Sequence, residues 1–230
     1  MSFFKDALSI FKKSELVLIE KVKETEGVYS FIFKKDKDLT WKPGQHGLFT
    51  ITHKKIKNNT KPLTVASIPS EDVVKITTKI GDNPSDFKSA LLELEAGMKI
   101  SMSGPVGSFY AKDDSPALFI AADIGITPFR AMIKQIEAEV NVEKQVKLLY
   151  LNSQGSHIYK EDLANTDVVV SFLTTNNELF QEIDRFTEKY NDKGQYFIAG
   201  SKPFVNTLTE HLKSNNISKR NVKRDVFVGC

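Results

Sequence analysis

The sequence predicts two domains, an N-terminal antiparallel β-barrel followed by an α/β domain built on an open parallel sheet. From residue 14 to about 110, short β-branched and aromatic runs alternate with turn signals such as "DKDLTWKPG" and "KNNTKP". After the polar break "AKDDSP", apolar strands alternate with amphipathic helical patterns, which is typical of a parallel sheet covered on both faces. The 230 residues are enough for two small domains. We therefore expect domains at 14–111 and 115–230.

The first domain is expected to consist of short strands with a single helix. That helix should run from Ser85 to about Leu94, with Gly97 beyond it. Several consecutive strands with so few helices favour a small antiparallel barrel. The expected strands are "SELVLIEKV", "GVYSFIFK", "GLFTITH", "DVVKITTKI" and "MKISMSG".

The second domain begins with the strand "ALFIAA" and a helix that should start near Pro128. The apolar face of this helix repeats at helical spacing; its members are Phe129, Met132, Ile133, Ile136 and Val140. The later strands are expected at "VKLLYL", "DVVVSFL", "QYFIAG" and "VKRDVFVG", and the later helices at "SHIYKEDLAN", over Leu179–Phe186 and over Phe204–Leu212.

Residues 1–13 are expected to form an N-terminal helix or extension, in which the apolar side chains would lie on one face of a helix. We favour a short helix that packs on the body of the protein over one that docks on a membrane or a partner. No secretory signal is recognisable, and no apolar run is long enough to span a bilayer.

Composition narrows the classes of function. The net charge of +3 is too balanced to indicate nucleic-acid binding, and no basic face is interleaved with aromatics. The single cysteine, Cys230, excludes an intrachain disulfide and a cysteine-ligated cluster, and it fits a cytoplasmic protein. The four histidines share no metal-ligand spacing, so we expect no metal site.

The stretch "ALFIAADIGITPF" is the first candidate for a functional loop. In an open parallel sheet, ligands bind beyond the carboxyl ends of the strands, where this loop lies. Gly125 permits close backbone approach, Thr127 is placed as an N-cap, and Pro128 suits a first helical turn. A helix that starts there favours a phosphate. These arguments alone leave a phosphate loop and a plain strand-to-helix turn about equally supported.

Six motifs that occur in a fixed order along the chain favour the phosphate loop. They are "WKPGQHGLFTI", "KPLTVAS", "GPVGSF", "IGITPF", "FIAGSKPFV" and "DVFVGC". Together they resemble the flavin- and pyridine-nucleotide-binding reductases of the ferredoxin–NADP reductase superfamily, over residues 14–230. The resemblance implies an FAD-binding barrel, an NAD(P)-binding α/β domain, and hydride transfer from NADH or NADPH to FAD, followed by electron transfer to an acceptor.

The resemblance assigns the flavin site to "KPLTVAS" and to the turn "KIGDNPSDF". Lys61 replaces the usual arginine for the flavin pyrophosphate, and Leu63 replaces an aromatic that stacks near the flavin. Thr64 would offer its hydroxyl to the hydride-accepting flavin nitrogen, which makes it the candidate catalytic residue. The full set implied for FAD is Lys61, Pro62, Leu63, Thr64, Val65, Ser67, Gly81 and Ser85.

The resemblance assigns the NAD(P)H site to two further segments. In "AADIGITPF", Ala122 and Asp123 occupy positions where the family has glycines. In "FIAGSKPF", Ala199 and Ser201 replace a cysteine and a proline near the nicotinamide. Cys230 stands where an aromatic often covers the flavin. The implied nucleotide set is Gly125, Thr127, Pro128, Gly200 and Ser201.

The motifs identify the electron donor and the electron acceptor less clearly than they identify the cofactor sites. Relatives that use NADPH carry basic residues near the end of the second parallel strand, where this chain has Ser153, with His157 and Lys160 as outside candidates. This favours NADH slightly, and both nucleotides remain open. The lysines of "HKKIKNNTK" suit either an acidic electron-transfer protein, the flavin phosphates, or a solvated loop, and apart from Lys61 we favour the loop.

Two functions stay in competition. The leading one is an NAD(P)H-dependent flavin oxidoreductase that has no attached iron–sulfur module and delivers electrons to a separate protein or small molecule. The alternative is a flavin- or nucleotide-binding sensor or partner subunit with little hydride transfer, which Leu63, Asp123, Ala199 and Cys230 favour as departures from the family pattern.

Overall fold

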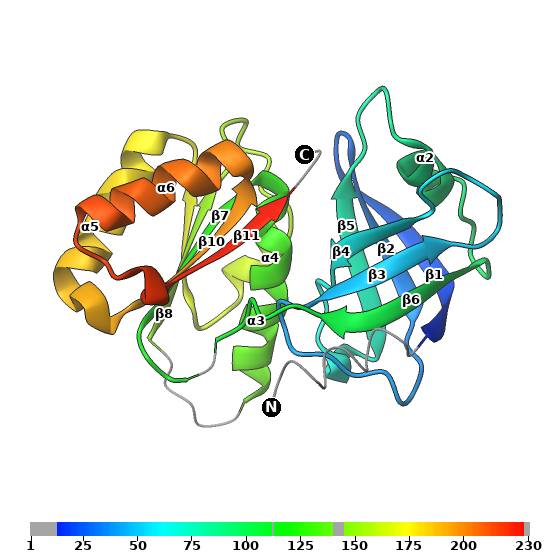
Figure 1. Ribbon diagram of the computed structural model, residues 1–230, viewed down its shortest axis with the longest axis horizontal. Coiled ribbons are helices and arrows are strands. Elements are labelled where there is room, and N and C mark those ends of the chain that lie inside the picture. Colours follow the sequence, from blue (N-terminus) through cyan, green and yellow to red (C-terminus); the bar gives the residue numbers. More distant parts are fainter. Residues whose placement is uncertain (1–12, 112, 140–144, 228–230) are drawn as a thin grey trace. The chain divides into compact units, whose positions relative to one another are not determined.

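The computed structural model describes residues 13–111, 113–139 and 145–227 (Figure 1). The chain divides into two compact units, residues 1–110 and 111–230. The expected N-terminal helix, Val140 and Cys230 lie outside the described residues.

The first unit contains a six-stranded antiparallel sheet in the order β4-β3-β6-β1-β2-β5. Its strands are β1 (Lys13–Thr25), β2 (Val28–Lys34), β3 (His46–Ile51), β4 (Thr60–Thr64), β5 (Val73–Lys79) and β6 (Lys99–Val106). Five of these were expected from short runs rich in β-branched and aromatic residues, separated by turn signals. The sequence pattern did not single out β4, because its five residues include a proline and three exposed side chains.

The edge strands of this sheet approach each other after β4, as a barrel requires. The N–H of Ala66 donates to the carbonyl of Lys75 at 2.8 Å. The enclosed core is rich in aromatic rings, with Phe31, Phe33 and Phe49 fully buried. The predicted helix is α2 (Asp86–Leu92), and the side chain of Ser85 caps it.

The second unit contains a five-stranded parallel sheet in the order β11-β10-β7-β8-β9. Its strands are β7 (Ala117–Ala122), β8 (Val146–Leu151), β9 (Val169–Leu173), β10 (Gln195–Ser201) and β11 (Val222–Phe227). Its helices are α3 (Thr127–Ala138), α4 (Lys160–Ala164), α5 (Asn176–Tyr190) and α6 (Lys202–Ser214), with short 3-10 turns at Asp123–Ile126 (η2), Asn191–Lys193 (η3) and Lys219–Asn221 (η4). The predicted order of an antiparallel barrel followed by a parallel α/β sheet is confirmed.

Alternate residues of β7 face opposite layers of helices. Leu118 and Ile120 belong to the cluster that also contains the apolar faces of α5 and α6. Phe119 instead stacks on Phe129 of α3, with ring centroids 5.0 Å apart. Figure 1 shows α3 and α4 on the other side of this sheet from α5 and α6. The sheet is therefore covered on both faces, as its continuous apolar strands indicate.

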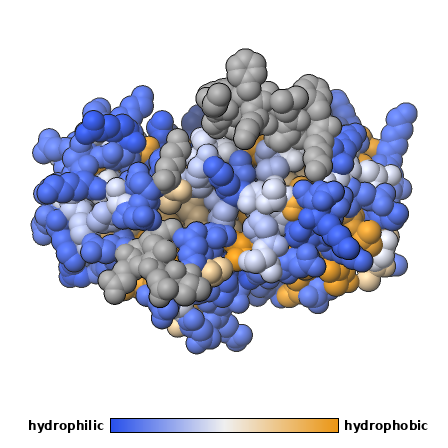
Figure 2. All heavy atoms as spheres, turned by 90° about the horizontal axis from the view of Figure 1, so that it is seen from below, coloured by the Kyte–Doolittle hydropathy of each residue, from blue (hydrophilic) through white to orange (hydrophobic). Residues whose placement is uncertain are grey.

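Most of the surface is hydrophilic on the face shown in Figure 2. Large apolar side chains with substantial exposure among the described residues are Ile19, Val169 and Val226. Among the described residues, no helix combines the length and apolar character needed to cross a membrane.

Candidate functional site

Thr64 ends β4 with a buried hydroxyl that lacks a partner. Its side chain is 4% exposed, and its Oγ1 atom makes no hydrogen bond within the described part of the chain. Leaving a buried hydroxyl unpaired costs about 1–3 kcal/mol, so native structures rarely retain one without a reason. A ligand atom that pairs with this hydroxyl would remove the cost. The residue predicted to be catalytic therefore carries a buried polar atom that the described part of the chain leaves unsatisfied.

The residues that precede Thr64 lie on an exposed edge strand. Lys61 and Pro62 are exposed, and Leu63 is partly buried against the core. No described residue pairs with the ammonium group of Lys61, which leaves this charge available to an anion. Residues 1–110 contain no arginine, and the role of Lys61 at the flavin pyrophosphate stays a prediction.

One lysine of the lysine-rich stretch after β3 forms an ion pair, and two others are exposed. The ammonium group of Lys54 donates to both carboxylate oxygens of Glu93, at 2.6 and 2.8 Å. This hydrogen bond is the main cause that lowers the pKa of Glu93. Lys55 and Lys57 are exposed. Part of the run is therefore committed to an ion pair within the protein.

Ser67 is buried, and its hydroxyl is used within the protein. It donates to the carbonyl of Val73 at 2.8 Å and accepts from the N–H of Lys75 at 2.9 Å. The carbonyl of Ser67 accepts from the indole of Trp41 at 2.8 Å. Val65 is also fully buried. These two members of the predicted flavin set shape the turn behind Thr64, and a direct contact with a flavin stays a prediction for them.

Gly81 and Ser85 lie on the exposed connection from β5 to α2. A Cβ atom at Gly81 would meet nothing within 4 Å, so the protein's own packing does not require this glycine. The Ser85 hydroxyl accepts from the N–H of Lys88 at 3.4 Å. Their proposed role at the flavin pyrophosphate stays a prediction.

In the second unit, the order of the strands reverses at β7, since β8 and β9 follow on one side and β10 and β11 on the other. Ligands of open parallel sheets bind at such a reversal, beyond the carboxyl ends of the strands. Gly125 lies there in the turn η2, and a Cβ atom on it would come within 2.2 Å of the carbonyl oxygen of Ala199. A Cβ on Gly200 would lie 3.4 Å from the Cβ of Ala122. The structure thus brings together the two segments that the sequence assigned to NAD(P)H.

The prediction that Thr127 caps the helix is wrong. Thr127 is already helical, the N-cap position is Ile126, and Ile126 forms no side-chain cap. The buried hydroxyl of Thr127 instead donates to the carbonyl of Ile124 at 3.1 Å. The preceding 3-10 turn supplies this acceptor, which the sequence pattern did not reveal. Pro128 lies in the first turn of α3, as expected.

Ser201 occupies the N-cap position of α6 without a side-chain cap hydrogen bond. No described residue is a partner of its hydroxyl. Among the nucleotide residues predicted from the sequence, Ser201 therefore has a side-chain polar group that remains available beside Gly200.

Asp123 and Asn152 form a polar pair at the carboxyl ends of β7 and β8. Asp123 is exposed and has a φ angle of +48°, a conformation that glycine adopts easily and that aspartate tolerates better than most residues. The side-chain amide of Asn152 donates to the Asp123 carboxylate at 3.0 Å. Sequence reasoning missed Asn152, whose position directly after a parallel strand was the available signal.

The two outside candidates for a 2′-phosphate are engaged elsewhere. Nε2 of His157 lies 3.1 Å from the carbonyl of Tyr150 and 3.0 Å from that of Leu173, so this nitrogen donates to the ends of β8 and β9. The ammonium group of Lys160 lies over the ring of Phe172, 5.7 Å from its centroid.

Arg130 is a second residue that sequence reasoning missed. Its guanidinium is buried, and Nε donates to the carboxylate of Asp162 at 2.8 Å, which joins α3 to α4. A lone charge in the apolar stretch "PFRAMI" was the available signal. Among the described residues, no group of three or more histidine, cysteine, aspartate or glutamate side chains is placed to hold a metal ion.

Comparisons with known proteins agree with this architecture. A flavohemoprotein of Oceanobacillus iheyensis is 24% identical over 238 residues, which cover 91% of this chain and 58% of that protein. A variant of ferredoxin-NADP+ reductase from Plasmodium falciparum superposes with a TM-score of 0.80 at 16% identity, covering 95% of this chain and 97% of that one. The flavohem-like FAD/NAD-binding domain of a Vibrio cholerae nitric oxide dioxygenase gives a TM-score of 0.73 at 21% identity and covers 93% of this chain and 98% of that domain.

No protein-family model matches the chain. The structural likeness nevertheless shows that the chain has the fold of ferredoxin-NADP+ reductase and of the flavohem-like FAD/NAD-binding domain. The chain spans 58% of the length of the flavohemoprotein.

Proposed function

We propose that this chain is an FAD-dependent oxidoreductase that takes a hydride from NADH or NADPH and passes electrons to a separate protein or small-molecule acceptor. The observation that carries the proposal is the unpaired, buried hydroxyl of Thr64, at the position that the resemblance assigns to the flavin. The fold supports it, because solved proteins with this fold include a ferredoxin-NADP+ reductase and an FAD/NAD-binding domain.

The residues of β4 fit a flavin. Bound FAD would supply the hydride-accepting and electron-releasing chemistry that no side chain offers. The hydroxyl of Thr64 would pair with a ring nitrogen, and the partly buried Leu63 would offer an apolar surface. Lys61 would place its charge against a phosphate, as a point charge without the two-pronged geometry of an arginine. We therefore expect FAD to be held less tightly than by an arginine-containing site.

The carboxyl ends of β7 and β10 fit a dinucleotide. Gly125 and Gly200 allow their backbones to lie close together, and α3 begins at this end of the sheet, where the helix N-terminus favours an anion. The role of these residues is to bind and orient the hydride donor, since alignment of the reacting atoms is what the protein contributes to such a transfer.

Charge on the first unit favours one kind of acceptor to test. Lys55, Lys57 and Lys61 are exposed and have no carboxylate partner among the described residues. Exposed positive charge accelerates association with a negatively charged partner. An acidic electron-transfer protein is therefore one acceptor to test, beside free flavins, quinones and ferric chelates.

The direct test is the visible absorption spectrum of the purified protein mixed with FAD, repeated without oxygen after addition of NADH and then NADPH. We expect flavin bands that shift on binding and bleach faster than those of free FAD. An absence of measurable affinity for FAD and FMN would overturn the proposal. Bands that shift without bleaching would support the alternative, a flavin- or nucleotide-binding sensor or partner subunit, which the exposed Asp123 carboxylate also favours.

A matched pair of variants isolates the Thr64 hydroxyl. Thr64→Val removes a hydroxyl without a partner, so the FAD-free protein should be as stable as wild type or more stable. Its FAD affinity should fall by up to about tenfold, the value of one neutral hydrogen bond. Thr60→Val makes the same change on the same strand, at an exposed hydroxyl bonded to Thr50, and should leave FAD affinity unchanged. Equal FAD affinity in both variants would contradict the assignment of Thr64.

A further inference from the structure

The Asp123 carboxylate has a fixed position at the carboxyl edge of the parallel sheet. The backbone conformation of Asp123, with φ +48°, directs the chain out of β7 into the turn η2. The carboxylate is exposed, and no cationic side chain of the described residues pairs with it. Its negative charge therefore faces whatever binds at this edge.

Asn152 orients this carboxylate toward β8. The side-chain oxygen of Asn152 accepts from the N–H groups of Gln154 at 3.0 Å and Ser156 at 3.2 Å. Because these two bonds fix the orientation of the side-chain amide, its nitrogen faces Asp123 and donates to the Asp123 carboxylate at 3.0 Å. Because Asn152 directly follows β8, the carboxylate of Asp123 is held beside the end of the second parallel strand.

The electrostatic influence of Asp123 extends to β8. Burial raises the pKa of Tyr150, which lies two residues before Asn152, and the negative charge of Asp123 adds to this increase. The carboxylate is therefore close enough to act on groups at this end of the strand.

A carboxylate at this place has a defined use in dinucleotide-binding sheets. There, an acidic residue at the end of the second strand accepts a hydrogen bond from the ribose 2′-hydroxyl, whereas a basic residue accommodates a 2′-phosphate. In this chain the acid comes from the end of the first strand and reaches the second through Asn152. The nearby basic side chains His157 and Lys160 contact backbone carbonyls and an aromatic ring.

We propose that Asp123, positioned by Asn152, selects a dinucleotide with a free ribose 2′-hydroxyl, such as NADH, over one with a 2′-phosphate, such as NADPH. The proposal rests on the nucleotide site of the proposed function and deepens it. A 2′-phosphate would bring a second anion beside the carboxylate, and a repulsion of this kind near a protein surface changes affinity by about tenfold or more.

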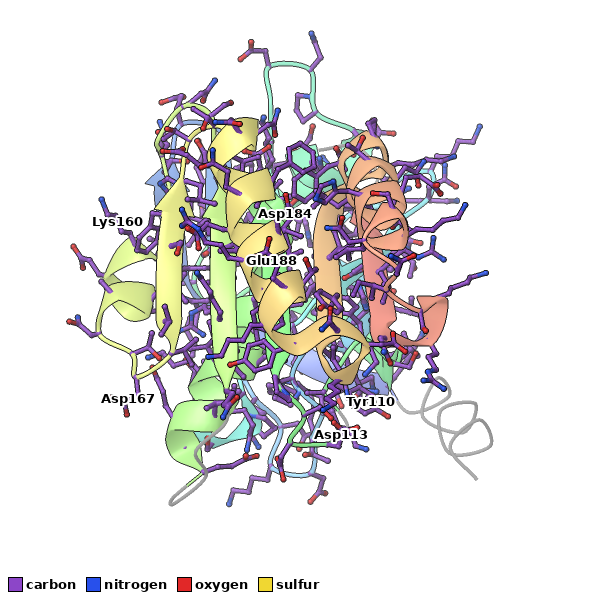
Figure 3. All side chains as sticks on the ribbon, turned by 90° about the vertical axis from the view of Figure 1, so that its left-hand side faces the viewer. Tyr110, Asp113, Lys160, Asp167, Asp184 and Glu188 are labelled. Carbon is purple, nitrogen blue, oxygen red and sulfur yellow. The ribbon has the colours of Figure 1, made fainter. Side chains whose placement is uncertain are left out.

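The test is calorimetric binding of two probes without a nicotinamide, ADP-ribose and 2′-phospho-ADP-ribose, to the full chain. Asp123→Asn removes the charge, keeps an oxygen that can accept from Asn152, and suits the left-handed backbone. Asp167→Asn is the matched control, because it removes the same charge at an exposed position just before β9, at the amino end of the same sheet. Figure 3 shows Asp167 and Lys160 at opposite ends of α4.

We expect wild type and Asp167→Asn to prefer ADP-ribose by about tenfold or more, and Asp123→Asn to lose most of that preference. Asn152→Ala should weaken the preference to an intermediate value, since it releases the carboxylate without removing it. A preference that Asp123→Asn leaves unchanged, or a wild type that binds the phosphorylated probe more tightly, would overturn this proposal alone. Failure of every variant to bind either probe would overturn the nucleotide site itself.

Discussion

Replacing Gly125 by alanine should destabilise the second unit strongly. The added Cβ would lie 2.2 Å from the carbonyl oxygen of Ala199, 2.6 Å from its carbonyl carbon and 2.9 Å from the N–H nitrogen of Gly200. All three atoms belong to one backbone peptide, so no flexible side chain can move aside, and η2 or β10 must shift. Overpacking of this kind costs typically 1–3 kcal/mol, and we expect about 3 kcal/mol here.

Urea unfolding followed by far-ultraviolet circular dichroism measures this loss in the full chain. Gly81→Ala is the control, because its Cβ would meet nothing within 4 Å, and its stability should stay within about 0.5 kcal/mol of wild type. Gly125→Ala should also lose affinity for ADP-ribose, since the same shift displaces the Gly200 segment. Indistinguishable unfolding midpoints for the two variants would refute the argument from close packing.

Two further substitutions test hydrogen bonds that stabilise the first unit and the second unit, respectively. Ser67→Ala should lower the free energy of unfolding by about 2 kcal/mol, since it leaves the carbonyl of Val73 and the N–H of Lys75 without their partner. Hydrogen bonds from the side chain and backbone of Ser218 hold the pKa of Asp192 below 3.8. Their stabilisation is therefore present above 3.8 and is lost as the pH falls through the lower folded-state pKa. Asp192→Asn should unfold at lower urea than wild type near neutral pH, with a difference that shrinks well below 3.8, and a difference independent of pH would contradict this.

Local patterns were sufficient to predict most of the elements. Short runs rich in β-branched and aromatic residues identified β2 and β5, and the helix expected from Ser85 to about Leu94 corresponds to α2, which Ser85 caps. Thr127 was expected to be an N-cap, and this assignment is wrong. The 3-10 turn before it provides a backbone acceptor for its hydroxyl, and that turn depends on the packing of Gly125 against β10, which is distant in sequence.

The candidate site was predictable in its segments but not in the state of its side chains. The motif order placed Thr64 and Ser67 together, yet nothing in "KPLTVAS" distinguishes a hydroxyl without a partner from one with two. Asn152 was not predictable as a partner of Asp123, because the contact joins the ends of two strands that are 29 residues apart. Hydrogen bonds between residues so far apart in the chain depend on the register of the sheet, and local sequence patterns do not reveal that register.

The indole of Trp41 gives the first unit an internal optical reporter. It belongs to the chain's single tryptophan, is buried, and donates to the carbonyl of Ser67, three residues beyond Thr64. Flavins absorb where tryptophan emits, so a flavin held by Thr64 would quench this emission by energy transfer. Occupancy of the site can then be followed in unlabelled protein, because all of the tryptophan emission comes from one indole that a hydrogen bond orients.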